Sequence, residues 1–194
     1  GDEYVLDGRK WFITNALDPR AKVGIVLGVT DPDGASHQRH SQVMFPMDTP
    51  GIEIERNISY MNHLAPEGTC EVVFRGVRVP LENLLGEEGA GFAMAQARLG
   101  PGRIHHCMRS IGQCEVALEL MCQRAIERRA FGKHLNEYSN IGDWIAEARI
   151  EIEQARLLVL KTAWIIDRDG NRAARREISM ITALVPPLQT KIVN

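Results

Sequence analysis

The side chains best suited to chemistry in this sequence are four arginines in its second half. Arg103, Arg109, Arg128 and Arg129 lie in or beside segments whose apolar residues have helical spacing. A guanidinium group presents a rigid fork of donors that matches phosphate and diphosphate oxygens, so these arginines are candidates for binding an anionic ligand. The same spacing is also typical of a solvated basic helix face. Both interpretations stay open from the residues alone.

Two further motifs offer weaker chemistry. The stretch Gly86–Gly91 has the order GxxGxG and contains two glutamates, whereas a dinucleotide-binding loop has GxGxxG inside a βαβ unit. It is interpreted as a flexible lead into a helix, with nucleotide binding as a lesser alternative. His105 and His106 are adjacent, so on a helix they point about 100° apart. No ligand follows them at i+4, which favours a structural role.

The cysteines predict no metal site. They show neither CxxC pairs nor the spacing of zinc ligands. We interpret them as small buried apolar residues in a reducing compartment. They are Cys70, Cys107, Cys114 and Cys122.

Composition excludes several classes of protein. The 194 residues include 23 Lys+Arg and 25 Asp+Glu, a net charge of −2 at pH 7, which gives no electrostatic footprint for nucleic acid. No apolar run approaches the roughly 18–20 residues that span a bilayer, so no membrane span is expected. Residues 1–4 lack the features of a secretory signal.

The chain changes character near residue 85. Residues 1–85 contain short apolar runs separated by turn signals such as Asp7-Gly8, which predicts six or seven antiparallel strands. Residues 86–194 have helical spacing and form a second predicted domain. The predicted fold class is therefore α+β, with an antiparallel β-barrel or sandwich-like domain followed by an antiparallel helical bundle.

Long helices are predicted in the second domain at residues 103–128, at residues 140–167 and from about Ala173 to Asn194. Pro186-Pro187 should kink the last of these or displace its first turn. The stretch Leu99–Arg103 conflicts with its surroundings, because proline and glycine disfavour a helix while apolar spacing resumes at Ile104. A single kinked helix and two separate helices are both compatible with it.

Several motifs then converge on one family. They lie, in this order, at residues 6–15 (LDGRKWFITN), 76–80 (GVRVP), 86–92 (GEEGAGF) and 127–132 (ERRAFG). The set resembles the acyl-CoA dehydrogenases, FAD-dependent flavoproteins that oxidise acyl-CoA thioesters to 2-enoyl-CoA. Residues 98–109 (RLGPGRIHHCMR) resemble the branch whose animal members are fused to a kinase-like domain.

The resemblance implies an N-terminal helical domain, a middle β domain and a C-terminal four-helix domain, assembled into dimers or tetramers. Residues 1–85 correspond to the middle domain and residues 86–194 to the first part of the last. The sequence is therefore expected to be a fragment, with an incomplete helical bundle.

The resemblance also assigns cofactor contacts. Phe12, Ile13 and Thr14 align with the family's W-I-T segment, which packs against the flavin and gives a hydroxyl to its N5. Phe12 replaces the commoner tryptophan but keeps an aromatic face. Arg128 aligns with an arginine that reaches the FAD diphosphate of a neighbouring subunit. Phe131 lies close by, and Ser139 replaces a glutamine that contacts the same FAD.

Substrate contacts follow in the same way. Arg103 aligns with an arginine that contacts acyl-CoA, and Gly100 replaces an aspartate common in the family. Some members carry their catalytic glutamate at the position of Gly102. Because glycine cannot remove a proton, the catalytic base is expected beyond Asn194, and no catalytic residue is assigned within the chain.

The function implied is that of an FAD-dependent acyl-CoA dehydrogenase fragment, inactive or nearly so by itself, with FAD as cofactor. Its partners would be an acyl-CoA substrate, an electron-transfer acceptor protein and further copies of itself. It would lie in the bacterial cytoplasm, or in the mitochondria or peroxisomes of a eukaryote. The alternative is a catalytically inactive remnant acting as a helical assembly module, with the glycine-rich loop as a nucleotide site ranked last.

Overall fold

The computed structural model describes residues 1–194 and divides into two compact units, Gly1–Ala95 and Gln96–Asn194. The division falls inside a long helix, α1 (Gly91–Glu127), rather than at the change of composition near residue 85. The first turn of α1 belongs with the strands because the ring of Phe92 stacks on His37, with centroids 4.7 Å apart. Gln42 Nε2 also donates a hydrogen bond to the carbonyl of Gly91.

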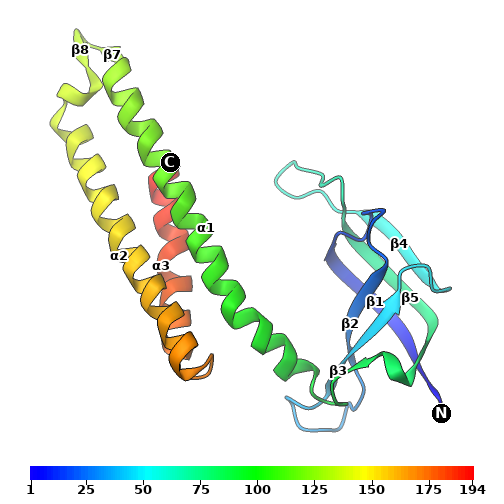
Figure 1. Ribbon diagram of the computed structural model, residues 1–194. Helices are drawn as coiled ribbons and strands as arrows, with labels where there is room; N and C mark the ends of the chain where they lie inside the picture. The colour runs from blue at the N-terminus through cyan, green and yellow to red at the C-terminus, as the bar shows by residue number, and fades with distance from the viewer. The chain divides into compact units, whose positions relative to one another are not determined.

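The first unit consists of two three-stranded antiparallel sheets (Figure 1). One has the order β1-β5-β4 and the other β2-β3-β6. A short 3-10 helix, Leu81–Asn83, separates β5 from β6. The strands are β1 (Glu3–Thr14), β2 (Val23–Val29), β3 (His40–Pro46), β4 (Ile52–Asn57), β5 (Thr69–Pro80) and β6 (Leu84–Leu85).

The two sheets share one hydrophobic core. Phe45 on β3 meets Phe74 on β5 edge to face, with centroids 5.3 Å apart. This confirms the expected antiparallel strands, but they do not close into a barrel. Each sheet ends in free edges, β1 and β4 in one and β2 and β6 in the other. The barrel alternative is thus corrected, because β6 is too short to continue the sheet and pairs only through Leu84 and Leu85.

The second unit consists of the remainder of α1 and two further helices beside it (Figure 1). A small hairpin, β7 (Arg129–Ala130) and β8 (Lys133–His134), and a 3-10 turn, Leu135–Glu137, join α1 to α2 (Ser139–Asp169). Helix α3 (Arg175–Val193) follows, and it runs through Pro186 and Pro187. None of the helices combines the length and apolar composition that a bilayer crossing requires.

The core of the second unit is built from one apolar stripe on each helix. On α2 the stripe includes Ile152, Ala155 and Val159, none of which is exposed to solvent. Helix α2 ends at Asp169 and is followed by Gly170, whose positive φ of 84° favours glycine over other residues. Cys107 and Cys114 on α1 are buried in the same core as free thiols, as expected.

The stretch around Pro101 is continuous helix, which decides between the two alternatives in favour of a single element. Proline removes one backbone donor, so local propensity opposes this. The carboxamide of Asn171, in the turn between α2 and α3, lies where a side chain on Gly100 would have to be, so glycine at this position lets the turn pack against the helix. Asn171 Nδ2 also donates to the carbonyl of Gln96 at 3.4 Å.

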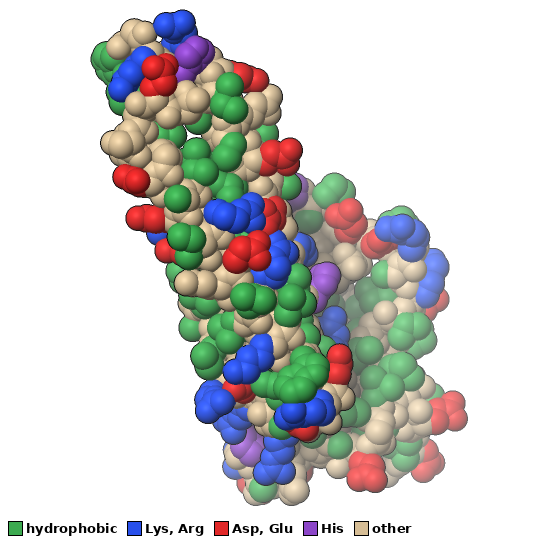
Figure 2. Space-filling view, turned by 60° about the vertical axis from the view of Figure 1, so that its left-hand side comes forward, with side chains coloured by type: hydrophobic (Ala, Val, Ile, Leu, Met, Phe, Trp, Pro, Cys, Tyr) green, Lys and Arg blue, Asp and Glu red, His purple; other side chains and the backbone are tan.

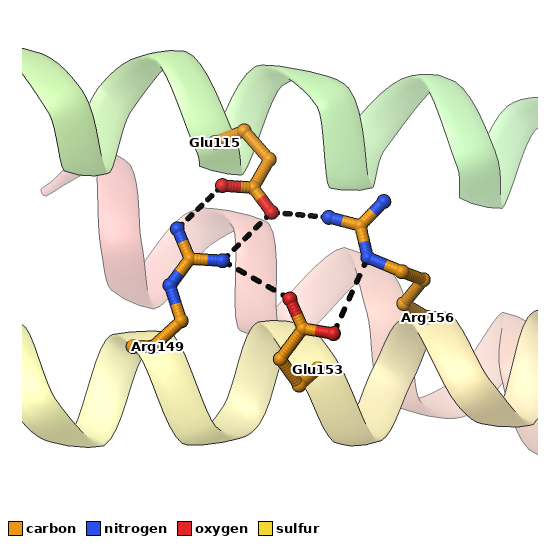
Figure 3. A network of polar contacts seen from close by, with 4 residues as sticks. All are labelled: Glu115, Arg149, Glu153 and Arg156. Atoms are coloured by element: carbon orange, nitrogen blue, oxygen red, sulfur yellow. Dashed lines mark hydrogen bonds and ion pairs between the residues drawn. The ribbon is translucent and has the colours of Figure 1, made fainter.

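An ion network joins α1 to α2 (Figure 3). Arg149 donates to Glu115 through both terminal guanidinium nitrogens, at 2.6 and 2.9 Å, and Arg156 binds the same carboxylate. Glu153 lies between the two arginines, 3.1 Å from Arg149 and 3.6 Å from Arg156. Hydrogen bonding from Arg149, together with the charges of Arg149 and Arg156, lowers the pKa of Glu115 despite its partial desolvation.

This lowered pKa predicts a loss of stability in acid. The folded state binds a proton at Glu115 less readily than the unfolded state does, so the network stabilises the fold above the pKa of an unfolded glutamate, about 4.3. The contribution is lost as pH falls through the lower folded-state pKa. Glu115→Gln should cost about 1 kcal/mol at pH 7 and flatten the pH dependence of urea unfolding below pH 5. Glu119→Gln, one turn later and unpaired, should leave that dependence unchanged.

Candidate functional site

The first group of candidate residues lies at the end of β1. Lys10 pairs with Val72 and Ile13 with Cys70, so Trp11 and Phe12 form a β-bulge opposite a single residue of β5. Phe12 has a φ of 56°, in the left-handed region that a bulky residue rarely adopts. The bulge leaves both aromatic rings half exposed, with centroids 4.9 Å apart. Backbone strain of this kind persists where the surrounding structure holds it, and it is common at functional sites.

Thr14 follows the bulge and has an exposed side chain. It pairs with Thr69 through the backbone, and its hydroxyl makes no hydrogen bond within the chain. The hydroxyl is therefore free to donate to a ligand. Ile13 beside it is 36% exposed.

A paired carboxylate lies opposite the bulge. Glu71 on β5 accepts hydrogen bonds from Arg9 and, at 2.7 Å, from Arg56. These bonds, that of Arg56 above all, lower the pKa of Glu71. Glu71 therefore stays ionised and fully paired, which makes it a structural anchor for the bulge and a poor candidate for a proton-abstracting base.

The second group occupies the connection between α1 and α2. Arg128 directly follows α1, Phe131 lies in the turn of the β7–β8 hairpin, and Ser139 is the first residue of α2. Phe131 has a φ of 50°, is followed by Gly132 at 87°, and is 99% exposed. Arg128 forms no ion pair and no side-chain hydrogen bond.

The third group surrounds Arg103. Its side chain lines a small pocket of about 170 Å³ between α1 and α3. Arg109 Nη2 lies 3.2 Å from His106 Nδ1 on the same side of α1. Burial raises the pKa of the Cys107 thiol in this pocket, so the thiol is a weak nucleophile there. The lining residues, none of them a carboxylate, are Arg103, His106, Cys107, Ser110, Thr182, Val185 and Pro186.

The structure therefore does not gather the predicted residues into one site. Arg103 and Arg128 are separated by 25 positions along α1 and its end, or about 37 Å at the rise of an α-helix. A single small ligand cannot touch both arginines of one chain. This separation fits two ligands, or one site made from two copies of the chain.

The glycine-rich loop has a structural explanation. The N–H of Gly89 donates to Ser41 Oγ at 2.8 Å, and that of Ala90 to the carbonyl of Glu87. A Cβ on Gly91 would lie 2.7 Å from the carbonyl oxygen of His40. The glycines thus let the loop approach the backbone of β3, and the N–H groups of Gly89 and Ala90 already have partners within the chain. The structure also contains no cluster of three metal-ligating side chains.

Two groups near these sites were not singled out from the sequence. Trp11 is 59% exposed beside Phe12, and the motif at residues 6–15 already contained it. Tyr138 donates a hydrogen bond to the carbonyl of Ala130 in the hairpin at 2.9 Å. No spacing rule predicts the contact of Tyr138, because it depends on how the hairpin folds back on the start of α2.

Comparison with known proteins defines the class. The family described as "Acyl-CoA dehydrogenase, C-terminal domain" matches residues 89–194. The chain is 50% identical over its full length to the probable acyl-CoA dehydrogenase FadE2 of Mycobacterium tuberculosis, of which it covers 48%. It is 49% identical to acyl-CoA dehydrogenase family member 11 of Gallus gallus, of which it covers 25%. The fold matches a putative acyl-CoA dehydrogenase from Mycobacterium abscessus with a TM-score of 0.93 and 46% identity, over 99% of this chain and 47% of that one.

These matches agree with the class of protein to which the motifs pointed. The chain belongs to the acyl-CoA dehydrogenase family. The avian match also confirms the resemblance to the animal branch. The chain spans about half the length of the mycobacterial relative and a quarter of the avian one.

Proposed function

We propose that this chain supplies cofactor- and substrate-binding residues to an acyl-CoA dehydrogenase that converts an acyl-CoA thioester to its 2-enoyl-CoA. The observation that carries the proposal is the strained bulge at the end of β1. It exposes the ring of Phe12 and places next to it a threonine whose hydroxyl has no partner. An aromatic face and a free donor are the groups that suit the ring of a flavin.

Each group of residues would then have a separate task. Phe12 and Ile13 would pack against the flavin ring, while Thr14 would donate to its N5. Arg128 would bind the diphosphate of FAD in a second copy, with Phe131 and Ser139 beside it, since a guanidinium can form paired charge-assisted bonds to phosphate oxygens. Arg103 would contact the acyl-CoA.

Bound FAD would supply the acceptor for the hydride that leaves the β-carbon of the acyl group. The matching α-proton must go to a base, and the thioester carbonyl must be polarised to make that proton acidic. Gly102 cannot serve as the base, and Glu71 is held by two arginines. In keeping with the family resemblance, we propose that the base lies beyond Asn194, and we expect the chain by itself to have little or no dehydrogenase activity.

A second copy is supported by the outer face of α2. Four large apolar residues on that face are at least half exposed, at spacings of seven, three and four: Ile150, Leu157, Leu160 and Trp164. Figure 2 shows apolar side chains exposed among charged ones along the helical unit. A helix with two apolar faces buries one in its own bundle and offers the other to a partner. We propose a dimer or tetramer that passes electrons to an acceptor protein, in the bacterial cytoplasm or in eukaryotic mitochondria or peroxisomes.

The same face favours the alternative function, a remnant that acts only as a helical assembly module. The two proposals differ in what they require of Arg128. A flavoenzyme needs its guanidinium at the cofactor, whereas an assembly module needs only the apolar face of α2.

Arg128→Ala tests the proposal. Loss of charge-assisted bonds worth about 1.5–3 kcal/mol should weaken FAD binding about 10- to 150-fold. The protein is purified with added FAD, free flavin is removed, and the visible absorption spectrum is recorded against protein concentration. Arg172→Ala is the matched control, because Arg172 is also an exposed arginine without an ion pair but lies at the other end of α2. Equal flavin retention by Arg128→Ala and the wild type would contradict the cofactor role and favour the assembly module.

A further inference from the structure

Tyr138 connects the β7–β8 hairpin to the start of α2. Its hydroxyl donates to the carbonyl of Ala130 at 2.9 Å, and the residue is half buried. Its own carbonyl accepts the N–H of Ile141 at 3.1 Å, in the first turn of α2. One residue is thus bonded to both the hairpin and the helix. Movement of the hairpin relative to α2 requires breaking the bond from the hydroxyl.

The ring of Tyr138 also holds the second strand of the hairpin. Lys133 Nζ lies 3.9 Å from the ring centroid, a distance at which a cation is attracted to an aromatic face. The same ammonium group donates to the carbonyl of Glu137 at 3.1 Å. The Glu137 carboxylate in turn accepts the N–H of His134 at 2.7 Å. Both strands of the hairpin are therefore fastened to the segment that ends in Tyr138.

The carbonyl that Tyr138 binds belongs to the residue directly before Phe131. Phe131 has a left-handed backbone conformation and an almost completely exposed ring, so its own side chain does nothing to hold it in place. The N–H of Leu135 donates to the carbonyl of Arg128 at 2.9 Å, which fixes the other end of the same segment. The bond from Tyr138 consequently sets the direction in which Phe131 leaves the helical unit.

We propose that Tyr138 is a positioning residue, which holds Phe131 and Arg128 in the orientation needed to meet the FAD bound in a second copy. The proposal rests on the cofactor role proposed above for Arg128 and Phe131. Tyr138 itself need not touch the cofactor. Its hydrogen bond restricts the hairpin before FAD binds, so less conformational entropy is lost on binding. Such preorganisation raises affinity without adding a contact.

Tyr138→Phe separates the hydroxyl from the ring, because phenylalanine keeps an aromatic face under Lys133. The first measurement is amide hydrogen exchange of residues 130–134 in the protein without FAD. Loss of one neutral hydrogen bond should speed this exchange about two- to tenfold. Tyr4→Phe is the matched control, since it removes a tyrosine hydroxyl that bonds Glu88 at 3.2 Å in the other unit. Unchanged exchange in Tyr138→Phe would overturn the proposal.

The second measurement is the affinity for FAD. Tyr138→Phe should weaken it about two- to tenfold while the thermal midpoint of unfolding and the exchange of the α2 interior stay at wild-type values. Tyr138→Leu, which also removes the ring under Lys133, should weaken it further. A general loss of stability with unchanged affinity would show a purely structural role and overturn the proposal.

The two proposals can fail separately. If Arg128→Ala weakens FAD binding but Tyr138→Phe changes neither exchange nor affinity, only the role of Tyr138 is overturned. If Arg128→Ala leaves FAD binding unchanged, the cofactor role of the hairpin is overturned, and positioning by Tyr138 is overturned with it.

Discussion

Ile152→Ala is expected to destabilise the helical unit by about 2–5 kcal/mol, the usual cost of cutting a fully buried isoleucine back to alanine. Ile152 is not exposed at all and lies at the centre of the core formed by α1, α2 and α3. The loss of stability combines the transfer free energy of the removed methyl and methylene groups with the free-energy cost of the cavity that they leave. Urea unfolding followed by circular dichroism at 222 nm measures it.

Ile150→Ala is the matched control for this substitution. It lies on the same helix, undergoes the same chemical change, and has a side chain that is 57% exposed. In dilute protein it should change the free energy of unfolding by no more than about 0.5 kcal/mol. Losses of similar size for both variants would mean that Ile150 is also buried. A dependence of those losses on protein concentration would then assign that burial to a second copy of the chain.

The sequence predicted the helical elements best where one apolar stripe and its terminators agree. Helix α2 was expected at residues 140–167 and runs from Ser139 to Asp169, because its inner face repeats every three or four residues and Gly170 ends it. Continuity of α1 through Pro101 could not be predicted. The helix packs at Gly100 against Asn171, about 70 positions later, a contact that the local sequence does not reveal.

Strand pairing lay beyond the sequence for a similar reason. Alternating apolar residues identify the strands, but β1 pairs with β5, whose residues lie more than 50 positions later. Nothing local decides between a closed barrel and two sheets with free edges. The free-energy cost of a free sheet edge, such as that of the short strand β6, depends on the loops that cover it and not only on the residues of the strand.

The sequence predicted which residues belong to the candidate site, but not how they are arranged in space. The motif at residues 6–15 pointed to Phe12 and Thr14, yet their presentation depends on a bulge that exists only in the register of β1 with β5. The motif at residues 127–132 pointed to Arg128 and Phe131. The contact that fixes their hairpin comes from Tyr138, which no recognised pattern includes.

Gly91→Ala is expected to destabilise the first unit by about 1–3 kcal/mol, the usual cost of forcing an extra carbon into a packed site. An added Cβ would lie 2.7 Å from the carbonyl oxygen of His40 and 2.8 Å from both the carbonyl carbon of Ser41 and Cδ1 of Leu27. Two of these neighbours are backbone atoms of β3, so relief requires the strand to move. Thermal unfolding monitored by near-ultraviolet circular dichroism measures the loss.

Gly102→Ala makes the opposite prediction within the same helix. No atom lies within 4 Å of its added Cβ, so the substitution only exchanges glycine for a better helix former and should stabilise α1 by up to about 1 kcal/mol. A loss of stability in Gly91→Ala beside a gain in Gly102→Ala would show that the close approach to β3, and not helix propensity, determines the effect at Gly91. A neutral Gly91→Ala would instead show that the loop can move away from β3. Its N–H groups would then be free, and the phosphate-binding interpretation of residues 86–91 would regain support.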